Sequence, residues 1–96
     1  MRSLYLVSYD ICSDRRLRKI YRIMNGYGDP VQYSVFVCEL SRREKAELQD
    51  KLGMVLNHTD DQVLIVHLGP AAGHGASCFE TLGKALAPGA RRVVVV

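Results

Sequence analysis

Residues 31–40 read VQYSVFVCEL, and whether this apolar run forms one strand or two decides the fold of the chain. Its branched and aromatic residues favour extended structure, and a Gly-Asp-Pro turn at residues 28–30 blocks any helix before it. Periodicity alone predicts a single strand. A bend near Tyr33–Ser34 gives two antiparallel neighbours instead, and the pattern of the surrounding chain favours this second interpretation.

The segments around this run alternate between strand and helix patterns. Residues 3–9 have an apolar strand pattern that Asp10 closes. A helix follows, capped by Ser13 or Asp14, and its apolar positions recur every three or four residues until the glycines at 26 and 28. Ser41 and Glu44 have the spacing of a capping box that opens a second helix. Residues 63–68 form a continuous apolar strand, which we expect at the centre of the sheet.

This order of elements predicts an α/β (α+β) fold of the ferredoxin-like β-α-β-β-α-β type, with helices on one face of a mostly antiparallel sheet. The chain of 96 residues is one small domain, and residues 1–68 form its core. Residues 69–90 are a glycine-rich connector, in which we expect a short helix over residues 76–87 around Phe79, Leu82 and Leu86.

Four valines end the sequence. They favour a strand and would expose apolar surface if they remained in water. We therefore expect residues 91–96 to pair with a sheet edge, either of the same chain or of a second copy. The four residues are Val93, Val94, Val95 and Val96.

Composition excludes several classes of protein. Hydrophobic residues make up 48% and charged residues 24% of the chain, which is typical of neither disordered nor fibrous proteins. No apolar run approaches the ~20 residues that span a bilayer, and no secretory signal opens the sequence, so we expect a cytoplasmic protein without membrane contact. The three cysteines lack metal-ligand spacing and are expected to be reduced thiols; they are Cys12, Cys38 and Cys78.

Positive charge is concentrated in the first helix. The net charge is +3, but residues 1–22 carry six bases and two acids, whereas residues 23–61 carry four bases and seven acids. A basic face of this kind attracts phosphate groups with a salt-dependent affinity, and a simple solvated helix face is the alternative. The candidate nucleic-acid-binding residues are Arg15, Arg16, Arg18, Lys19 and Arg22.

Asp10 is the candidate catalytic and metal-ligating residue. It ends the first strand, where α/β proteins often place functional groups. Mg²⁺ binds through one or two carboxylates, so one aspartate from each of two symmetry-related copies would supply a site that polarises a phosphodiester. A plain turn former is the alternative. Nearby, Tyr9, Tyr33 and Phe36 have rings that stack on bases, although aromatic residues in strands more often belong to a core or an interface.

Two motifs flank the arginine-rich helix. Tyr5-Leu6-Val7-Ser8-Tyr9-Asp10-Ile11 precedes it, and Gly26-Tyr27-Gly28 with Val31-Gln32-Tyr33-Ser34-Val35-Phe36 follows it. In this order and spacing they resemble, over residues 3–68, the CRISPR-associated protein 2 family, the small ferredoxin-like partner of the CRISPR adaptation integrase.

The resemblance implies a homodimer in which the C-terminal strand crosses to the partner's sheet and Asp10 of both chains faces one Mg²⁺. It matches Arg16 and Arg18 to the family's basic positions, and Phe36 to its phenylalanine. Family members are described as metal-dependent nucleases of RNA or DNA, and also as a scaffold that bridges two integrase dimers and holds a DNA duplex. The partners implied are therefore single-stranded RNA or duplex DNA, and the integrase.

The sequence departs from the family pattern at two places. Asp29-Pro30 stands where a basic residue often precedes the second motif, and residues 69–90 are longer and richer in glycine than the usual link. Three functions therefore stay open: a Mg²⁺-dependent endonuclease, a non-catalytic scaffold in CRISPR adaptation, and a toxin-like or regulatory dimer of the same fold.

Overall fold

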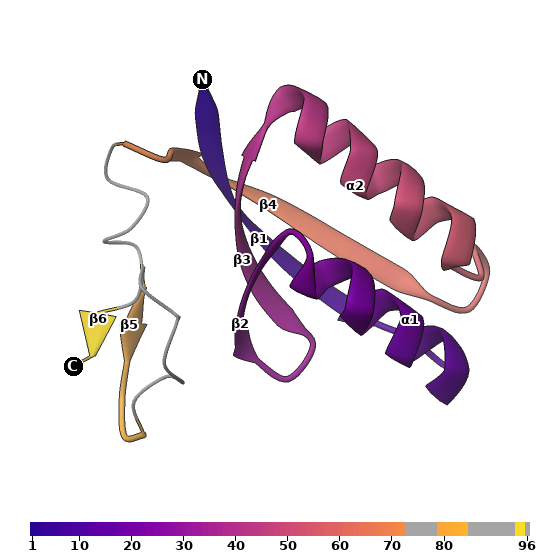
Figure 1. Ribbon diagram of the computed structural model, residues 1–96. Helices are drawn as coiled ribbons and strands as arrows, with labels where there is room; N and C mark the ends of the chain where they lie inside the picture. Colours follow the sequence, from indigo (N-terminus) through magenta and orange to yellow (C-terminus); the bar gives the residue numbers. More distant parts are fainter. Residues whose placement is uncertain (73–78, 85–93, 96) are drawn as a thin grey trace.

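The computed structural model describes residues 1–72, 79–84 and 94–95. Its elements follow the expected β-α-β-β-α-β order (Figure 1). They are β1 (Arg2–Asp10), α1 (Asp14–Asn25), β2 (Gly28–Gln32), β3 (Val35–Ser41), α2 (Arg42–Val55) and β4 (Gln62–Pro70), and two short strands follow, β5 (Glu80–Thr81) and β6 (Val94–Val95). Within these described ranges, no helix is long and apolar enough to cross a membrane.

Four strands form the main sheet in the order β2-β3-β1-β4, with every neighbouring pair antiparallel. Both helices lie on the same face of this sheet (Figure 1). The expectation that the strand over residues 63–68 is central was wrong, since β4 lies at an edge. A central position is taken by β1, which pairs with β3 on one side and with β4 on the other, so β4 ends the sheet.

Residues 31–40 belong to two strands, β2 and β3, and the chain bends between them near Tyr33–Ser34, as predicted. Ser34 makes the turn in a left-handed conformation with φ of 62°. The predicted turn at residues 28–30 was wrong, because these residues begin β2 and pair with β3. Pro30 is tolerated there because β2 is an edge strand, where a missing N–H breaks no ladder.

Gly28 is where the two strands come closest. A Cβ atom at this position would stand 2.5 Å from Sγ of Cys38 and 2.5 Å from the carbonyl oxygen of Val37. Only a residue without a side chain fits such a contact, so this glycine belongs to the packing of β2 on β3.

Both helices begin at the predicted caps. The Ser13 side chain accepts a hydrogen bond from the Arg16 amide at the start of α1, and Gly26 caps its end. At α2, Ser41 and Glu44 form the full capping box. These caps satisfy amides that would otherwise lack partners and fix where each helix starts on the sheet.

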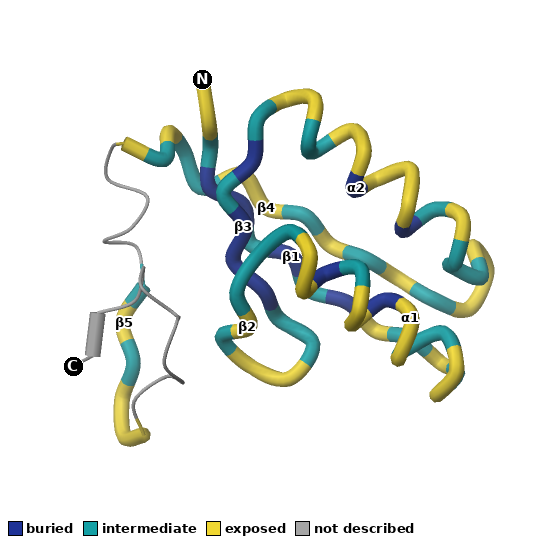
Figure 2. The backbone as a smooth tube through the Cα atoms, viewed as in Figure 1, coloured by how far each residue is buried: buried dark blue, intermediate teal, exposed yellow. Residues whose placement is uncertain are grey.

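The core lies between the helices and the sheet (Figure 2). Alternate residues of the central strands point toward the helices, and the apolar stripe of each helix covers them. Phe36 is fully buried at the centre. The other buried members are Tyr5, Val7, Tyr9, Ile20, Met24, Cys38, Leu40, Leu48 and Leu52.

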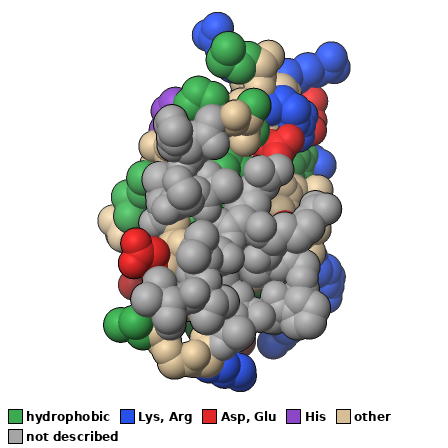
Figure 3. All heavy atoms as spheres, turned by 90° about the vertical axis from the view of Figure 1, so that its left-hand side faces the viewer, with side chains coloured by type: hydrophobic (Ala, Val, Ile, Leu, Met, Phe, Trp, Pro, Cys, Tyr) green, Lys and Arg blue, Asp and Glu red, His purple; other side chains and the backbone are tan. Residues whose placement is uncertain are grey.

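The opposite face of the sheet is also apolar. Leu4 and Val37 are buried without belonging to the core between sheet and helices, whereas Leu64 and Val66 of β4 are 54% and 37% exposed. Figure 3 views the molecule from the side of β5 and β6; some hydrophobic side chains lie along its margin, and lysine and arginine side chains are visible at both ends.

The C-terminal part differs from expectation. Residues 80–81 form β5 rather than a helix, and Gly83 adopts φ of 82°, a left-handed conformation that interrupts helical geometry. Val94–Val95 forms a strand, as predicted, and pairs in parallel with β5 of the same chain. The remaining residues of the expected helix and terminal strand, including Val93 and Val96, lie outside the described residues.

Candidate metal and nucleic-acid site

Asp10 lies at the carboxyl end of β1, paired with Gln62 of β4. Its side chain is exposed. Because successive residues of a strand point to opposite faces, and Tyr9 points into the core, Asp10 points to the face of the sheet away from the helices. No hydrogen bond or ion pair engages its carboxylate in the part of the chain that the structure describes, so this carboxylate is available to a ligand.

A single carboxylate is an incomplete metal site. Over the described ranges, no group of three or more histidine, cysteine, aspartate or glutamate side chains is close enough to hold a metal ion. A hard cation such as Mg²⁺ needs only one or two carboxylates and completes its shell with water. Asp10 therefore fits the expected site as one ligand, provided that a second copy of the chain contributes another.

The basic run on α1 divides into two kinds of residue. Four cations are exposed on the outward side of the helix, as predicted: Arg15, Arg18, Lys19 and Arg22. Arg16 behaves differently, since only 27% of its side chain is exposed and it forms an ion pair with Asp61.

The ion pair between Arg16 and Asp61 joins the start of α1 to the loop before β4. Nε of Arg16 donates to Oδ2 of Asp61 at 2.6 Å, and its Nη2 donates to Oδ1 at 3.1 Å. The carboxylate, which is itself fully buried, also accepts from the amides of Cys12 and Asn57, each at 2.9 Å. The Arg16 guanidinium, together with these two amides, holds the pKa of Asp61 well below its usual range.

The ion pair changes the role expected of Arg16 and gives Asp61 a structural role. Arg16 was predicted to bind nucleic acid, but its charge is opposed by a buried carboxylate, so it holds together the loop that follows Asp10. Asp61, in the loop before β4, was not among the predicted site residues, and it is the acceptor of four hydrogen bonds. No sequence signal pairs the two, since they stand 45 positions apart.

Two of the three aromatic candidates, Phe36 and Tyr9, are core residues, whereas Tyr33 in the turn between β2 and β3 is 85% exposed. Phe36 is fully buried, with its ring 6.2 Å from that of Tyr9 and 5.7 Å from that of Tyr21. It is therefore closed to base stacking in this conformation. Tyr9 is 6% exposed, and its burial is the main cause of its raised pKa, so its hydroxyl keeps the proton.

The two cysteines that the structure describes are free thiols in different surroundings. Burial raises the pKa of the Cys38 thiol to about 12, which keeps it protonated and inert. Cys12 is exposed, and its thiol donates to the carbonyl of Asp60. Cys78 lies outside the described ranges.

Comparison with known proteins places this arrangement in a family. The model of the family described as CRISPR associated protein Cas2 matches residues 1–72. The chain belongs to the Cas2 family. A curated relative from Geobacter sulfurreducens, named CRISPR-associated endoribonuclease Cas2, is 38% identical over 96 residues, which is 100% of both chains.

Solved structures agree with the Cas2 assignment. A crystal structure of Streptococcus pyogenes Cas2 at pH 6.5 matches with a TM-score of 0.62 and 26% identity, covering 66% of this chain and 82% of that one. A hypothetical protein from Thermus thermophilus matches with a TM-score of 0.68 and 36% identity, covering 76% of this chain and 85% of that one. The ferredoxin-like fold predicted from the sequence is thus the fold shared with Cas2.

Proposed function

We propose that this member of the Cas2 family binds nucleic acid and hydrolyses phosphodiester bonds with Mg²⁺ held by Asp10 from each subunit of a homodimer. The observation that carries this proposal is the exposed carboxylate of Asp10, free of partners in the described ranges, at the end of β1. Support also comes from relatives such as the Geobacter protein, which is named an endoribonuclease.

The homodimer is supported by the sheet face that carries Asp10. Leu64 and Val66 expose apolar side chains there, and the outer edge of β4 has no neighbour in the four-stranded sheet. Burying such a face against its own copy removes apolar surface from water and brings two equivalent carboxylates together. In this arrangement the strand of terminal valines, which pairs with β5 of its own chain, would pair along its other edge with the partner's sheet, and deletion of residues 93–96 should give monomer or aggregate in sedimentation. A stable dimer of the shortened chain would refute that role.

In the proposed reaction, Asp10, the exposed cations of α1 and Arg16 have different roles. A bound Mg²⁺ supplies charge for the scissile phosphate and lowers the pKa of a bound water. Asp10 orients that site, and the exposed cations of α1 hold the phosphates of the flanking strand. Arg16 acts on the site only indirectly, since it and Asp61 fix the loop between β1 and α1.

A cleavage assay tests the proposal. Wild type and Asp10→Asn are incubated with single-stranded RNA and with duplex DNA, each with Mg²⁺ and with chelator. We expect Mg²⁺-dependent cleavage by wild type and none by Asp10→Asn. Asp50→Asn is the matched control, because it removes an exposed carboxylate from α2 and should cleave like wild type. Cleavage that survives in Asp10→Asn or in chelator contradicts the proposal.

A scaffold without catalysis is the second candidate, and the placement of charge favours it. The exposed cations of α1 lie on the helix side of the sheet, whereas Asp10 points to the other side, so binding does not require Asp10. In this role the dimer would bridge the CRISPR adaptation integrase and hold a DNA duplex. Absence of cleavage, together with equal duplex binding by wild type and Asp10→Asn, would support it. Membership of the Cas2 family argues against a toxin-like or regulatory role outside CRISPR systems.

A further inference from the structure

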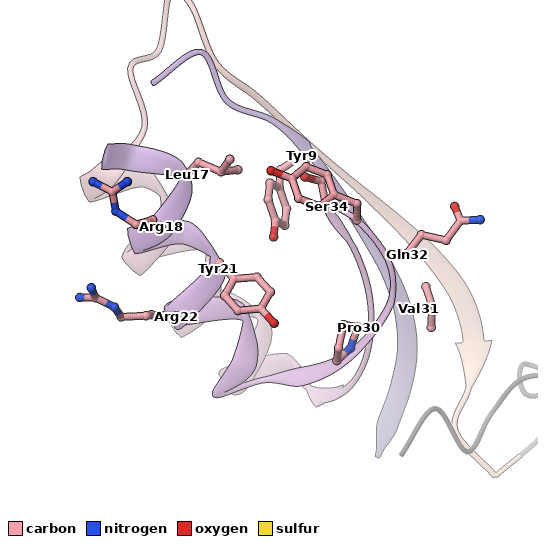
Figure 4. A pocket seen from close by; sticks show the side chains of 10 residues that line it. Tyr9, Leu17, Arg18, Tyr21, Arg22, Pro30, Val31, Gln32 and Ser34 are labelled. Atoms are coloured by element: carbon pink, nitrogen blue, oxygen red, sulfur yellow. The ribbon is translucent and has the colours of Figure 1, made fainter. Parts of the chain in front are cut away.

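A cavity of about 800 Å³ lies on the helix side of the sheet, between α1 and the turn that joins β2 to β3. This volume is in the range of sites for small organic groups, ~300–1,000 Å³. Figure 4 shows Leu17 and Tyr21 pointing from α1 toward Tyr9 and Ser34 on the other wall. The cavity is separate from Asp10, which points to the opposite face of the sheet.

The wall of the cavity is aromatic and firmly supported. Tyr21 is 49% exposed, and its ring stands edge-on to Phe36 at 5.7 Å between centroids. Tyr9 stacks on the same Phe36 from β1. Because Phe36 is fully buried, it holds both rings in place, and the exposed side of Tyr21 is left for a planar group.

Both charged residues that line the cavity in the described part of the chain are arginines. Arg18 and Arg22 stand one turn apart on α1 and contribute to its lining. Figure 4 shows their guanidinium ends extending away from the cavity, on the outward side of the helix. Neither forms an ion pair with a described residue. An apolar recess next to free cations is complementary to a flat base joined to a negatively charged backbone.

We propose that this cavity binds an unpaired base of a single-stranded nucleic acid, stacked against Tyr21, while the neighbouring phosphates bind Arg18 and Arg22. The inference rests on the proposed function, because it assumes that the protein binds nucleic acid. A base within a duplex is paired and stacked on its neighbours, so only an unpaired base can enter a recess of this kind. The hydroxyls of Tyr9 and Ser34 lie on the opposite wall and hydrogen-bond each other. A hydroxyl can donate one hydrogen bond and accept others, so this pair can still hydrogen-bond the edge of the base.

Fluorescence titration tests the proposal. The probe is a single-stranded RNA decamer with one central 2-aminopurine, whose emission falls when the base stacks on an aromatic ring, and a second decamer is abasic at that position. Chelator is present throughout, so that cleavage does not alter the probe. We expect wild type to quench the 2-aminopurine and to bind the abasic decamer more weakly.

Tyr21→Leu removes the stacking surface but keeps an apolar side chain. Stacking on one aromatic ring is expected to change affinity about 5- to 150-fold, so this variant should bind the intact decamer that much more weakly and no longer quench it. Its affinity for the abasic decamer and for duplex DNA should equal that of wild type. Tyr27→Leu is the matched control, since Tyr27 is another partly buried tyrosine packed on the core but lies outside the cavity.

The outcomes separate the two claims. If wild type binds neither the decamers nor duplex DNA, the proposed nucleic-acid function fails, and this inference fails with it. If wild type binds duplex DNA but neither decamer, this inference alone fails. If wild type binds both decamers equally without quenching, or if Tyr21→Leu binds and quenches like wild type, the protein binds nucleic acid but not through a base in this cavity.

Discussion

Replacing arginines one by one on α1 separates the cations that bind phosphate from the one that holds the fold together. Arg18 and Arg22 are exposed and have no ion-pair partner among the described residues, whereas Arg16 is paired with the buried carboxylate of Asp61. We therefore expect Arg18→Gln with Arg22→Gln to weaken binding and leave stability unchanged. Arg16→Gln should lower the melting temperature and change the salt dependence of binding little.

The magnitude follows from counterion release. Each phosphate contact on a single strand contributes about 0.7 to the slope of log K against log salt. Losing the contacts of Arg18 and Arg22 thus reduces the slope by about 1.4. Between 50 and 200 mM salt, the double variant should lose about 7-fold less affinity than wild type loses over the same range. Arg16→Gln should keep the wild-type slope.

The assay is fluorescence anisotropy of a labelled single-stranded RNA at four salt concentrations, with a thermal melt of each variant. Arg42→Gln is the control, because it removes an exposed arginine from the start of α2. A slope reduced by about 0.7 in Arg16→Gln, the contribution of one phosphate contact, would refute the reasoning. It would mean that Arg16 leaves Asp61 to bind phosphate.

Three further predictions concern stability. Gly28→Ala should lower the melting temperature, because its Cβ would stand 2.5 Å from Sγ of Cys38. Gly53→Ala, in an open part of α2, should instead raise the free energy of unfolding by up to ~1 kcal/mol. Equal melting temperatures for the two variants would contradict this. Leu48→Ala removes a fully buried side chain and should cost about 2–5 kcal/mol in urea denaturation, and a smaller loss would mean that the core relaxes into the space. Because the pKa of Asp61 is lowered in the folded protein, its charged carboxylate stabilises the fold at pH values above the ordinary carboxyl pKa of about 3.9. This stabilisation should be lost as the pH falls below that value. Asp61→Asn should therefore flatten the acid side of a plot of melting temperature against pH.

Local signals predicted most of the fold. The caps at Ser13 and Ser41 and the apolar spacing of both helices act within a few residues of each other, so the sequence alone locates them. The bend at Ser34 was predicted from the order of the elements rather than from local propensity. The edge position of β4 was missed, because a continuous apolar run indicates burial on both faces. Here both faces are apolar, but one of them carries the exposed side chains of Leu64 and Val66.

The site was predicted less completely, for a physical reason. Asp10 and the exposed cations of α1 are neighbours in sequence, so their placement follows from the end of one strand and the face of one helix. The pairing of Arg16 with Asp61, and the cavity between Tyr21 and Ser34, depend on how separate elements meet in space. Nothing in one sequence fixes those contacts before the strand order is known.

The contacts of the Asp61 carboxylate also determine when, during synthesis, the loop after Asp10 can take its final shape. Its carboxylate holds the amide of Cys12 and the side chain of Arg16, both of which leave the ribosome long before Asp61 does. Until then β1 lacks its β4 neighbour, and the loop after Asp10 has no anchor. Closing so long a segment costs chain entropy, and only the completed sheet compensates for it, so the end of β1 that carries Asp10 is among the last parts of the molecule to take its final shape. Asp10 is therefore synthesised well before the contacts that fix the loop beside it can form.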